Sequence, residues 1–350
     1  MNSVRSAKYA LGGAAAVATL AACTSNGGGG ASQLAPMGPG MPSNAMHSAL
    51  GPTAAIRPTT AIDRRDNVTV NPDRRRSWMD ASAKGSSLLY ISDSGTNAVR
   101  VYSYPKVKLT GTLTGFSNPQ GECVDKAGNV WVTSTSASQI VEYAHGATTP
   151  IATLNDPGQY PVGCSVDAKT GNLAVSNIYA TTGPPGSVSI YKKAAGSPTS
   201  YAPPGFADVY FLGYDSKGTL YLDGITSGSS FLFASFKGKK FTTITLGHAI
   251  GGPGAVQAVG KNVVVGDQTI AANAAYTFAI SGSTGTLEST TPLTGANDIV
   301  QFYVQKKTIA GGDFNPNGGS TVDLFAYPAG GSPTKTVTGV TAPIGAVVSP

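Results

Sequence analysis

Carboxylate and amide side chains stand directly before several short stretches that the sequence predicts to be strands. The residues concerned are Asn118, Gln159, Asp208, Asn297 and Asp298. Carboxylate and amide oxygens are the hard donors that a divalent cation such as Ca²⁺ prefers. If the strands lie side by side, these side chains converge on one opening. Turn chemistry offers a second explanation, because Asn and Asp also favour the turns that precede strands.

A cysteine follows an N-terminal segment that is typical of export. Arg5 and Lys8 supply positive charge, and the apolar run over residues 11–20 is too short to span a bilayer as a stable helix. The Leu-Ala-Ala-Cys sequence that ends at Cys23 resembles a bacterial lipobox. The resemblance implies that residues 1–22 are a signal peptide and that Cys23 is lipidated. The alternative is an ordinary signal peptide followed by a chance cysteine.

Two further cysteines lie in equivalent copies of one repeated segment, one position out of phase. Cys123 aligns with Ser165, and Cys164 aligns with Glu122. Alternate residues of a strand face opposite sides of a sheet, so the two cysteines either face each other or face apart. Two cysteines that remain after lipidation in an exported protein favour a disulfide.

Other catalytic patterns are weak. His47, His145 and His248 have no metal-ligand spacing, and no Gly-x-Ser-x-Gly sequence occurs. Ser189 and Lys192 form a Ser-x-x-Lys match, but a spacing of three on a predicted strand sends the side chains to opposite faces. Residues 86–350 hold fifteen Lys and Arg against fourteen Asp and Glu. The pI near 9 is therefore no argument for a nucleic-acid partner.

Residues 23–85 are predicted to be a disordered, low-complexity tether. A glycine run at residues 27–30 and several prolines interrupt any regular pattern, and such a segment cannot bury enough apolar surface to fold. A cluster of five of its arginines either contacts acidic headgroups or belongs to a solvated linker. They are Arg64, Arg65, Arg74, Arg75 and Arg76, with aspartates interleaved among them. Trp78 and Met79 are expected to pack on the domain as it begins.

The elements that must position the polar residues repeat along the chain. The segment from Asn118 to Ser134 contains a strand, a turn and a second strand, and it returns at residues 160–176 with the same Pro-x-Gly, Val-Asp and Gly-Asn pairs. A period of 40–50 residues with several short strands is typical of propeller blades. Second, third and outer strands each occur six times after Leu88, which predicts six blades.

First strands occur only five times within this run. They start near Gly121, Gly163, Val209, Ala255 and Ile299. The sixth is expected at the C-terminus, where Pro343 and Gly345 repeat the Pro-x-Gly sequence. Residues 86–350 are therefore predicted to form an all-β, six-bladed β-propeller that the C-terminal strand closes. Closure removes the open sheet edge that a linear array would leave.

The predicted strands resemble NHL-type propeller repeats. Residues 89–97 with Val99 and Val101 look like the strand–turn–strand core, and the segment from Pro119 to Val132 looks like the blade start. Six-bladed lactonases of the gluconolactonase and paraoxonase type resemble the chain in architecture only. That similarity implies a metal at the channel mouth and a glutamate from the closing strand, where this chain has Ile344, Ala346 and Ser349.

Two classes of function follow from these patterns. The first is a monomeric, non-catalytic binding or scaffold module for proteins or envelope ligands. It has no cofactor, and Cys23 anchors it to the extracytoplasmic face of the cell membrane, or to the outer membrane where the organism has one. The alternative is a metal-dependent hydrolase, similar to the lactonases, or a lyase, with a divalent cation such as Ca²⁺ at the channel mouth. Oxygen side chains that converge on one point favour the enzyme, whereas a glycine-rich or apolar channel favours the binding module.

Overall fold

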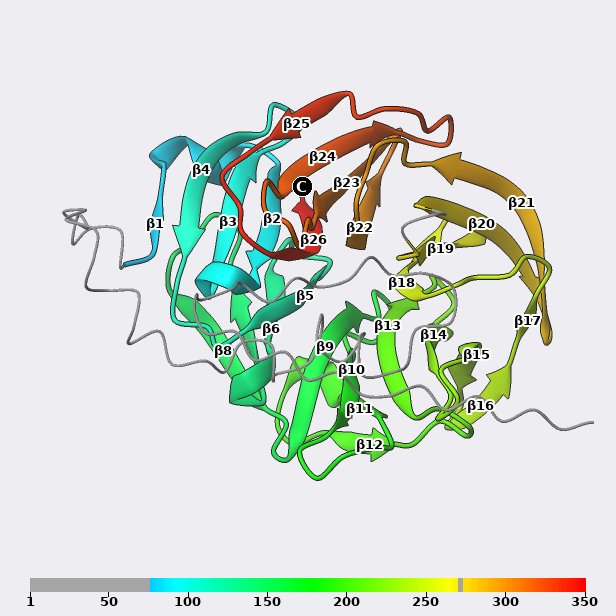
Figure 1. The fold of residues 1–350 in the computed structure, drawn as a ribbon. Coiled ribbons are helices and arrows are strands. Elements are labelled where there is room, and N and C mark those ends of the chain that lie inside the picture. The colour runs from blue at the N-terminus through cyan, green and yellow to red at the C-terminus, as the bar shows by residue number, and fades with distance from the viewer. Residues whose placement is uncertain (1–75, 270–272) are drawn as a thin grey trace, which may run out of the picture. The chain divides into compact units, whose positions relative to one another are not determined.

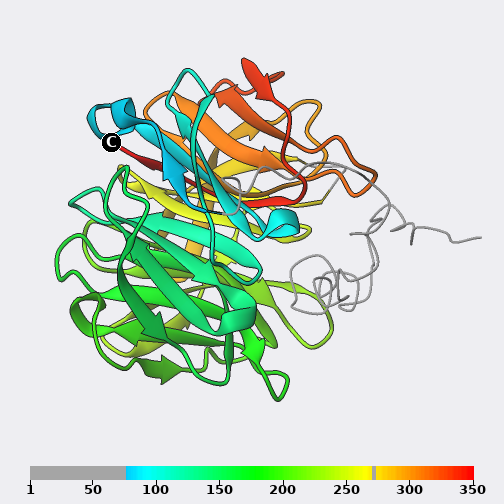
Figure 2. The ribbon, with the colours of Figure 1, turned by 90° about the vertical axis from the view of Figure 1, so that its left-hand side faces the viewer.

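The computed structural model describes residues 76–269 and 273–350, and these residues form a six-bladed β-propeller. Six sheets surround a central axis (Figure 1). Figure 2 turns the ring by 90° and shows the sheets of neighbouring blades packed against each other. The described residues contain only short 3₁₀ turns besides strands, and none of their helices is long and apolar enough to cross a membrane.

Each blade is an antiparallel sheet whose strands follow one another from the centre outwards. Blade 1 contains β26 (Pro343–Ser349), β2 (Leu88–Asp93), β3 (Ala98–Ser103), β4 (Lys108–Leu113) and β1 (Trp78–Met79). Blade 2 contains β5 (Pro119–Val124), β6 (Val130–Ser134), β7 (Gln139–Tyr143) and β8 (Pro150–Asn155). Blade 3 contains β9 (Gln159–Val166), β10 (Leu173–Ala180), β11 (Ser187–Tyr191) and β12 (Thr199–Tyr201).

The other three blades have the same order. Blade 4 contains β13 (Asp208–Tyr214), β14 (Leu220–Ile225), β15 (Phe231–Lys237) and β16 (Lys240–Thr243). Blade 5 contains β18 (Pro253–Val259), β19 (Asn262–Asp267), β20 (Ala274–Ser281) and β21 (Thr284–Pro292), and β17 (Thr245–Leu246) pairs in parallel on its outer edge. Blade 6 contains β22 (Ile299–Gln305), β23 (Thr308–Asp313), β24 (Thr321–Ala326) and β25 (Lys335–Val337).

The C-terminal strand closes the ring, as the sequence predicts. β26 pairs with β2 in antiparallel register, from Leu88 opposite Ser349 to Asp93 opposite Pro343. The first blade is thereby built from both ends of the described chain, and its inner strand comes from the last residues.

The Pro-x-Gly repeat marks a close approach between inner strands. A Cβ atom added at Gly345 of β26 would lie within 3.0 Å of the backbone oxygen of Gln120, and one added at Gly121 of β5 would lie within 3.0 Å of that of Val162. Real Cβ atoms do not approach backbone so closely. Glycine therefore stands where the inner strand of one blade leans on the next.

Apolar side chains fill the spaces between blades. The cluster between blades 2 and 3, for example, includes Trp131, Leu173 and Tyr191, all of which are buried. Burial of an apolar side chain of this size contributes roughly 1.5–3 kcal/mol, so the between-blade clusters hold the ring together. Their positions follow the alternation of apolar residues along the strands.

The structured part begins earlier than residue 86. β1 pairs with β4, with Trp78 opposite Thr112, and the 3₁₀ turn η4 (Ala81–Gly85) buries Ala83 in the core of blades 1 and 2. Residues 76–85 therefore belong to blade 1, although the sequence assigned them to the tether. A two-residue strand has no alternation for a sequence pattern to detect. The remainder of the predicted tether lies outside the described residues.

The strand order gives the ring two different ends. We call the end where the inner strands begin the mouth, and the opposite end the base. The mouth carries the connections into each inner strand and the loops between second and third strands. The base carries the turns between first and second strands and between third and outer strands.

Candidate functional site: the two ends of the central channel

The five polar residues that the sequence places at the channel mouth all lie next to the start of an inner strand. Asn118 precedes β5, and Asn297 and Asp298 precede β22. Gln159 and Asp208 are the first residues of β9 and β13. Their hydrogen bonds decide what each side chain does there.

Asn118 and Gln159 take part in local hydrogen bonds. The backbone N–H of Asn118 donates to Asn97 Oδ1 at 2.7 Å, and Asn118 has a positive φ of 53°. Ser187 Oγ donates to Gln159 Oε1 at 3.1 Å, so this amide joins two strands of blade 3. Both bonds shape the loops that lead into the inner strands.

Asn297 and Asp298 are held by a carboxylate at the end of the second strand of blade 6. Asp313 Oδ1 accepts the backbone N–H groups of Asn297 at 2.8 Å and of Asp298 at 2.9 Å. Asp313 Oδ2 accepts a bond from Asn297 Nδ2 at 3.0 Å. Buried backbone N–H groups require an acceptor, and Asp313 supplies it.

Blades 1 and 5 have the same arrangement, in which an aspartate accepts the N–H groups of a loop. Asp93 accepts the backbone N–H of Ala342 at 2.9 Å, and Asp267 accepts those of Gly251 at 2.8 Å and Gly252 at 3.0 Å. Each carboxylate ends a second strand and binds the loop that enters its own blade's inner strand. The sequence analysis did not predict a role for these aspartates. Their shared position at the end of a second strand is a repeated pattern that could have identified them.

Two mouth aspartates lie in strongly desolvated positions. Burial, and then the negative charge of Asp313, raise the pKa of Asp298 to about 8. Asp298 Oδ1 is buried without a hydrogen-bond partner among the described residues. Asp208 interacts with the hydroxyl of Tyr210, whose pKa is raised well above its usual value, chiefly by burial. Among the described residues, no three His, Cys, Asp or Glu side chains are grouped so that they could hold a metal ion.

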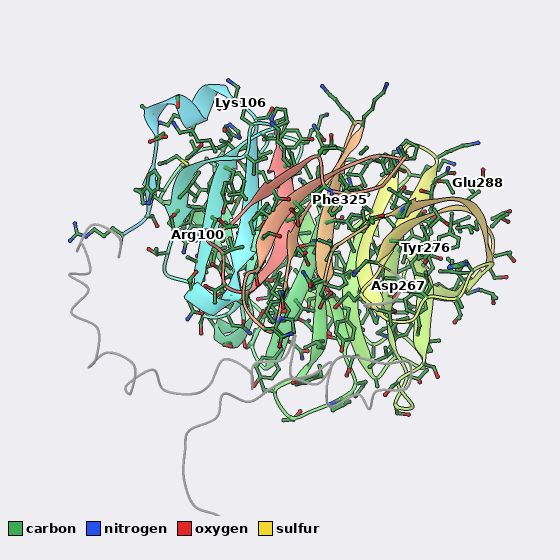
Figure 3. All side chains as sticks on the ribbon, turned by 45° about the horizontal axis from the view of Figure 1, so that its top comes forward. Arg100, Lys106, Asp267, Tyr276, Glu288 and Phe325 are labelled. Carbon is green, nitrogen blue, oxygen red and sulfur yellow. A yellow bond between two sulfur atoms is a disulfide. The ribbon has the colours of Figure 1, made fainter. Side chains whose placement is uncertain are left out.

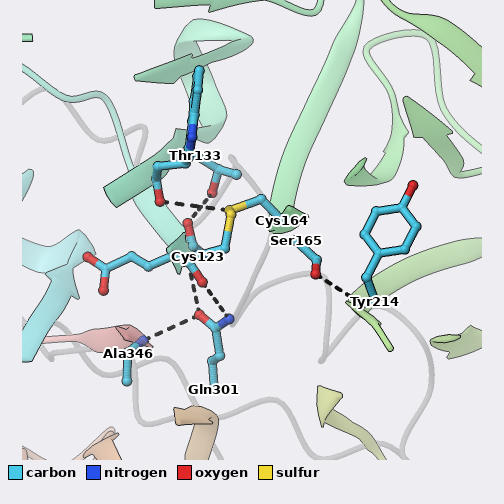
Figure 4. Close-up of a disulfide and its surroundings, with 10 residues drawn as sticks. Cys123, Thr133, Cys164, Ser165, Tyr214, Gln301 and Ala346 are labelled. Atoms are coloured by element: carbon cyan, nitrogen blue, oxygen red, sulfur yellow. Dashed lines mark hydrogen bonds between the residues drawn. A yellow bond between two sulfur atoms is a disulfide. The ribbon is translucent and has the colours of Figure 1, made fainter. Parts of the chain in front are cut away.

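The base end of the channel contains a cavity of about 170 Å³ between the inner strands of blades 2 to 6. Glutamines in its wall bind backbone. Gln301 Nε2 donates to the backbone oxygen of Glu122 at 3.1 Å, and its Oε1 accepts the N–H groups of Glu122 at 3.0 Å and Ala346 at 3.3 Å (Figure 4). Gln257 makes the matching pair with Val304, at 3.0 Å and 2.7 Å. Inner strands expose an unpaired edge to the channel, and these amides satisfy part of it.

Glu122 is the carboxylate of this cavity wall. It is 2% exposed, and Ser92 Oγ donates to its Oε1 at 2.8 Å. Its Oε2 has no partner among the described residues. Burial raises the pKa of Glu122 to about 8, so the carboxyl is mostly protonated at neutral pH. No feature of the sequence distinguished Glu122 as a buried acid.

Cys123 and Cys164 form a disulfide between the inner strands of blades 2 and 3, and both line the cavity. Their Cα atoms are 5.6 Å apart (Figure 4). The opposite parity of the two positions therefore means that they face each other, and the predicted pairing is confirmed.

The histidines have structural neighbours. His145 Nδ1 lies 2.6 Å from Ser349 Oγ, its Nε2 lies 3.1 Å from the backbone oxygen of Ser86, and Ser349 Oγ donates to the backbone oxygen of Gly128. This cluster ties the closing strand to blade 2. His248 packs on the ring of Tyr276. Cys23 and His47 lie outside the described residues.

Comparison with known proteins supports the fold alone. No family model and no curated protein sequence matches the chain. Among solved structures, the chain in a nidogen–laminin complex aligns with a TM-score of 0.62 at 12% identity, over 76% of this chain and 99% of that one. A protein of unknown function from Bacteroides caccae aligns with a TM-score of 0.58 at 8% identity, over 75% and 99%. A virginiamycin B lyase from Staphylococcus aureus reaches 0.47 at 12% identity, over 63% and 72%, which supports no conclusion about this chain.

Proposed function

We propose that this protein is a binding module of the cell envelope, held at the extracytoplasmic face of the membrane through a lipidated Cys23 and directed at protein or envelope ligands. The observation that supports it is the use of the mouth carboxylates. Asp93, Asp267 and Asp313 accept the N–H groups of the loops that enter the inner strands. They thereby hold the loops of a rigid ring, and loops on a rigid scaffold suit recognition.

The competing function, a metal-dependent hydrolase or lyase, needs oxygens that are available to a cation. Ca²⁺ takes six to eight oxygen ligands. Among the described residues of the mouth, Asp298 Oδ1 is a buried carboxylate oxygen without a hydrogen-bond partner, and the oxygens of the neighbouring Asp313 accept bonds from residues 297 and 298. Among the described residues, this donor set is smaller than a calcium site requires, which favours the binding module.

The membrane anchor is tested by fractionation in the native host. Wild-type protein is expected in the membrane fraction, with acyl groups on Cys23 detected by mass spectrometry. Cys23→Ala is expected in the soluble extracytoplasmic fraction. Thr24→Ala serves as the neighbouring control and stays with membranes. A Cys23→Ala chain that remains in the membrane fraction contradicts lipid anchoring.

The absence of catalysis is tested on the purified Cys23→Ala chain. Metal analysis is expected to find less than one equivalent of any divalent metal, and a panel of lactones is expected to remain intact. Stoichiometric calcium that Asp298→Asn removes, together with lactone hydrolysis that the same variant abolishes, would instead establish the enzyme.

A further inference from the structure

The lysines of the ring are confined to its base. All fifteen lysines of the described residues are exposed, and each lies in a base turn, at the strand end beside one, or in η4 at the base end of β2. They are Lys84, Lys106, Lys108, Lys126, Lys169, Lys192, Lys193, Lys217, Lys237, Lys239, Lys240, Lys261, Lys306, Lys307 and Lys335. In Figure 3, Lys106 lies at the upper edge of the molecule, whereas Asp267 lies well below it, within the ring.

Acidic residues are concentrated at the opposite end of the ring, the mouth. The aspartates that end second strands or begin inner strands, such as Asp93, Asp208 and Asp267, lie at the mouth and are buried. Six acidic residues lie near the base: Asp80, Asp125, Glu142, Asp167, Asp215 and the buried Glu122 of the cavity wall. Three of them accept N–H groups of their own turns. The ring as a whole is close to neutral, but its base is strongly positive.

The positive charge is spread over the whole ring. Blades 1, 3, 4 and 6 each contribute three or four lysines, and blades 2 and 5 contribute one each. A linear polyanion is usually bound along a groove or a stripe of positive charge. Here the charge lies at the tips of turns from all six blades, a distribution that fits a flat anionic surface. Two exposed apolar side chains, Leu109 (40% exposed) and Ile151 (55% exposed), stand beside this face, near the base ends of β4 and β8.

We propose that the base of the ring docks on an anionic lipid bilayer, with the lysines facing the phosphate headgroups. Each lysine near such a surface adds an attraction that salt screens within a Debye length. The contact is separate from any anchor at Cys23 and does not depend on it. An extended chain from Cys23 to Ser77 can reach on the order of 170 Å, so an anchored tether allows the ring to turn its base to the membrane.

The test uses the full-length Cys23→Ala chain, which removes the lipid anchor. It is sedimented with phosphatidylcholine vesicles that contain either 30% or no phosphatidylglycerol. We expect co-sedimentation with the anionic vesicles, weak binding to the neutral ones, and release as sodium chloride is raised from 0.05 M to 0.5 M. The face variant carries Lys239, Lys240, Lys306 and Lys307 changed to Gln, and we expect its partition coefficient to fall at least 100-fold.

The matched control changes four arginines of the tether, Arg64, Arg65, Arg74 and Arg75, to Gln and removes the same charge. It is expected to lose far less binding than the face variant. Thermal unfolding of both variants, with midpoints within a few degrees of the parent, shows that the ring is intact. Equal binding to neutral vesicles, or loss in the tether variant alone, overturns the proposal. So does charge-dependent binding to a soluble polyanion, such as polyphosphate, by a chain that binds no vesicles.

Discussion

At the scale of single residues, the polar groups around the channel bind backbone. Asp313 accepts two loop N–H groups, and Gln301 accepts backbone N–H groups on the edges of β5 and β26. A buried donor or acceptor that loses its partner costs about 1–3 kcal/mol, so such side chains fix the inner strands. Glu122 differs from them, because one of its carboxylate oxygens is buried without a partner among the described residues.

Glu122 makes stability depend on pH. Its pKa is raised from 4.5 to about 8, chiefly by burial. Between these two pH values, the folded state keeps a proton on Glu122 that the unfolded state releases. The contribution of Glu122 to the unfolding free energy is therefore fully present below pH 4.5 and is lost as pH rises to about 8. We expect the unfolding free energy of the wild type to fall relative to Glu122→Gln over this window, by up to about 1.4 kcal/mol per pH unit. Chemical denaturation from pH 4 to 9 measures it.

A control separates this effect from general charge. Glu288→Gln removes an exposed carboxylate of β21, and it is measured in parallel as the comparison for the loss of one surface charge. If the stability difference between Glu122→Gln and the wild type did not change with pH, Glu122 would be ionised in the folded protein.

At the scale of elements, the inner strands depend on glycine where they lean on one another. In Gly345→Ala, the new Cβ would meet the backbone oxygen of Gln120 within 3.0 Å. Overpacking of this kind costs about 1–3 kcal/mol, and the midpoint of denaturation is expected to fall accordingly. Gly85→Ala is the control, because nothing lies within 4 Å of its added Cβ. Equal stability of the two variants would contradict the close approach.

The elements were largely predictable, but their side-chain contacts were not. Alternation and the Pro-x-Gly repeat are local signals, and they predicted six blades and closure by the last strand. The partners of Gln301 and Gln257 are 179 and 47 residues away along the chain, so no local pattern identifies them. The local sequence predicted that Asn297 and Asp298 lie at the mouth. Their hydrogen bonds with Asp313 depend on the register between β22 and β23, which no local pattern gives.

At the scale of the whole molecule, the disulfide joins two neighbouring blades and leaves the other four without such a link. It closes a loop of 41 residues. The chain-entropy model gives such a loop about 4 kcal/mol, so Cys123→Ala combined with Cys164→Ala should lower stability by up to that amount. Hydrogen exchange is expected to rise first in β5 and β9. The parent for this comparison is Cys23→Ala, which should show no free thiol when denatured without reductant.

A uniform rise in exchange over all six blades would show that the ring unfolds as a single unit, and two free thiols in the denatured parent would contradict the disulfide.

The pairing of β2 with β26 also sets an order in time. The ribosome makes β2 about 250 residues before its inner partner, so the first blade stays incomplete until the last seven-residue strand has emerged. All strands of blades 2 to 6 are synthesised before β26, so these blades can fold one after another. Until β26 has been made, the blades can form only an open arc, and the pairing of β26 with β2 turns this arc into a ring. A chain that stops before β26 leaves the inner edge of β2 unpaired and uncovers the parts of β5 and β22 that β26 contacts.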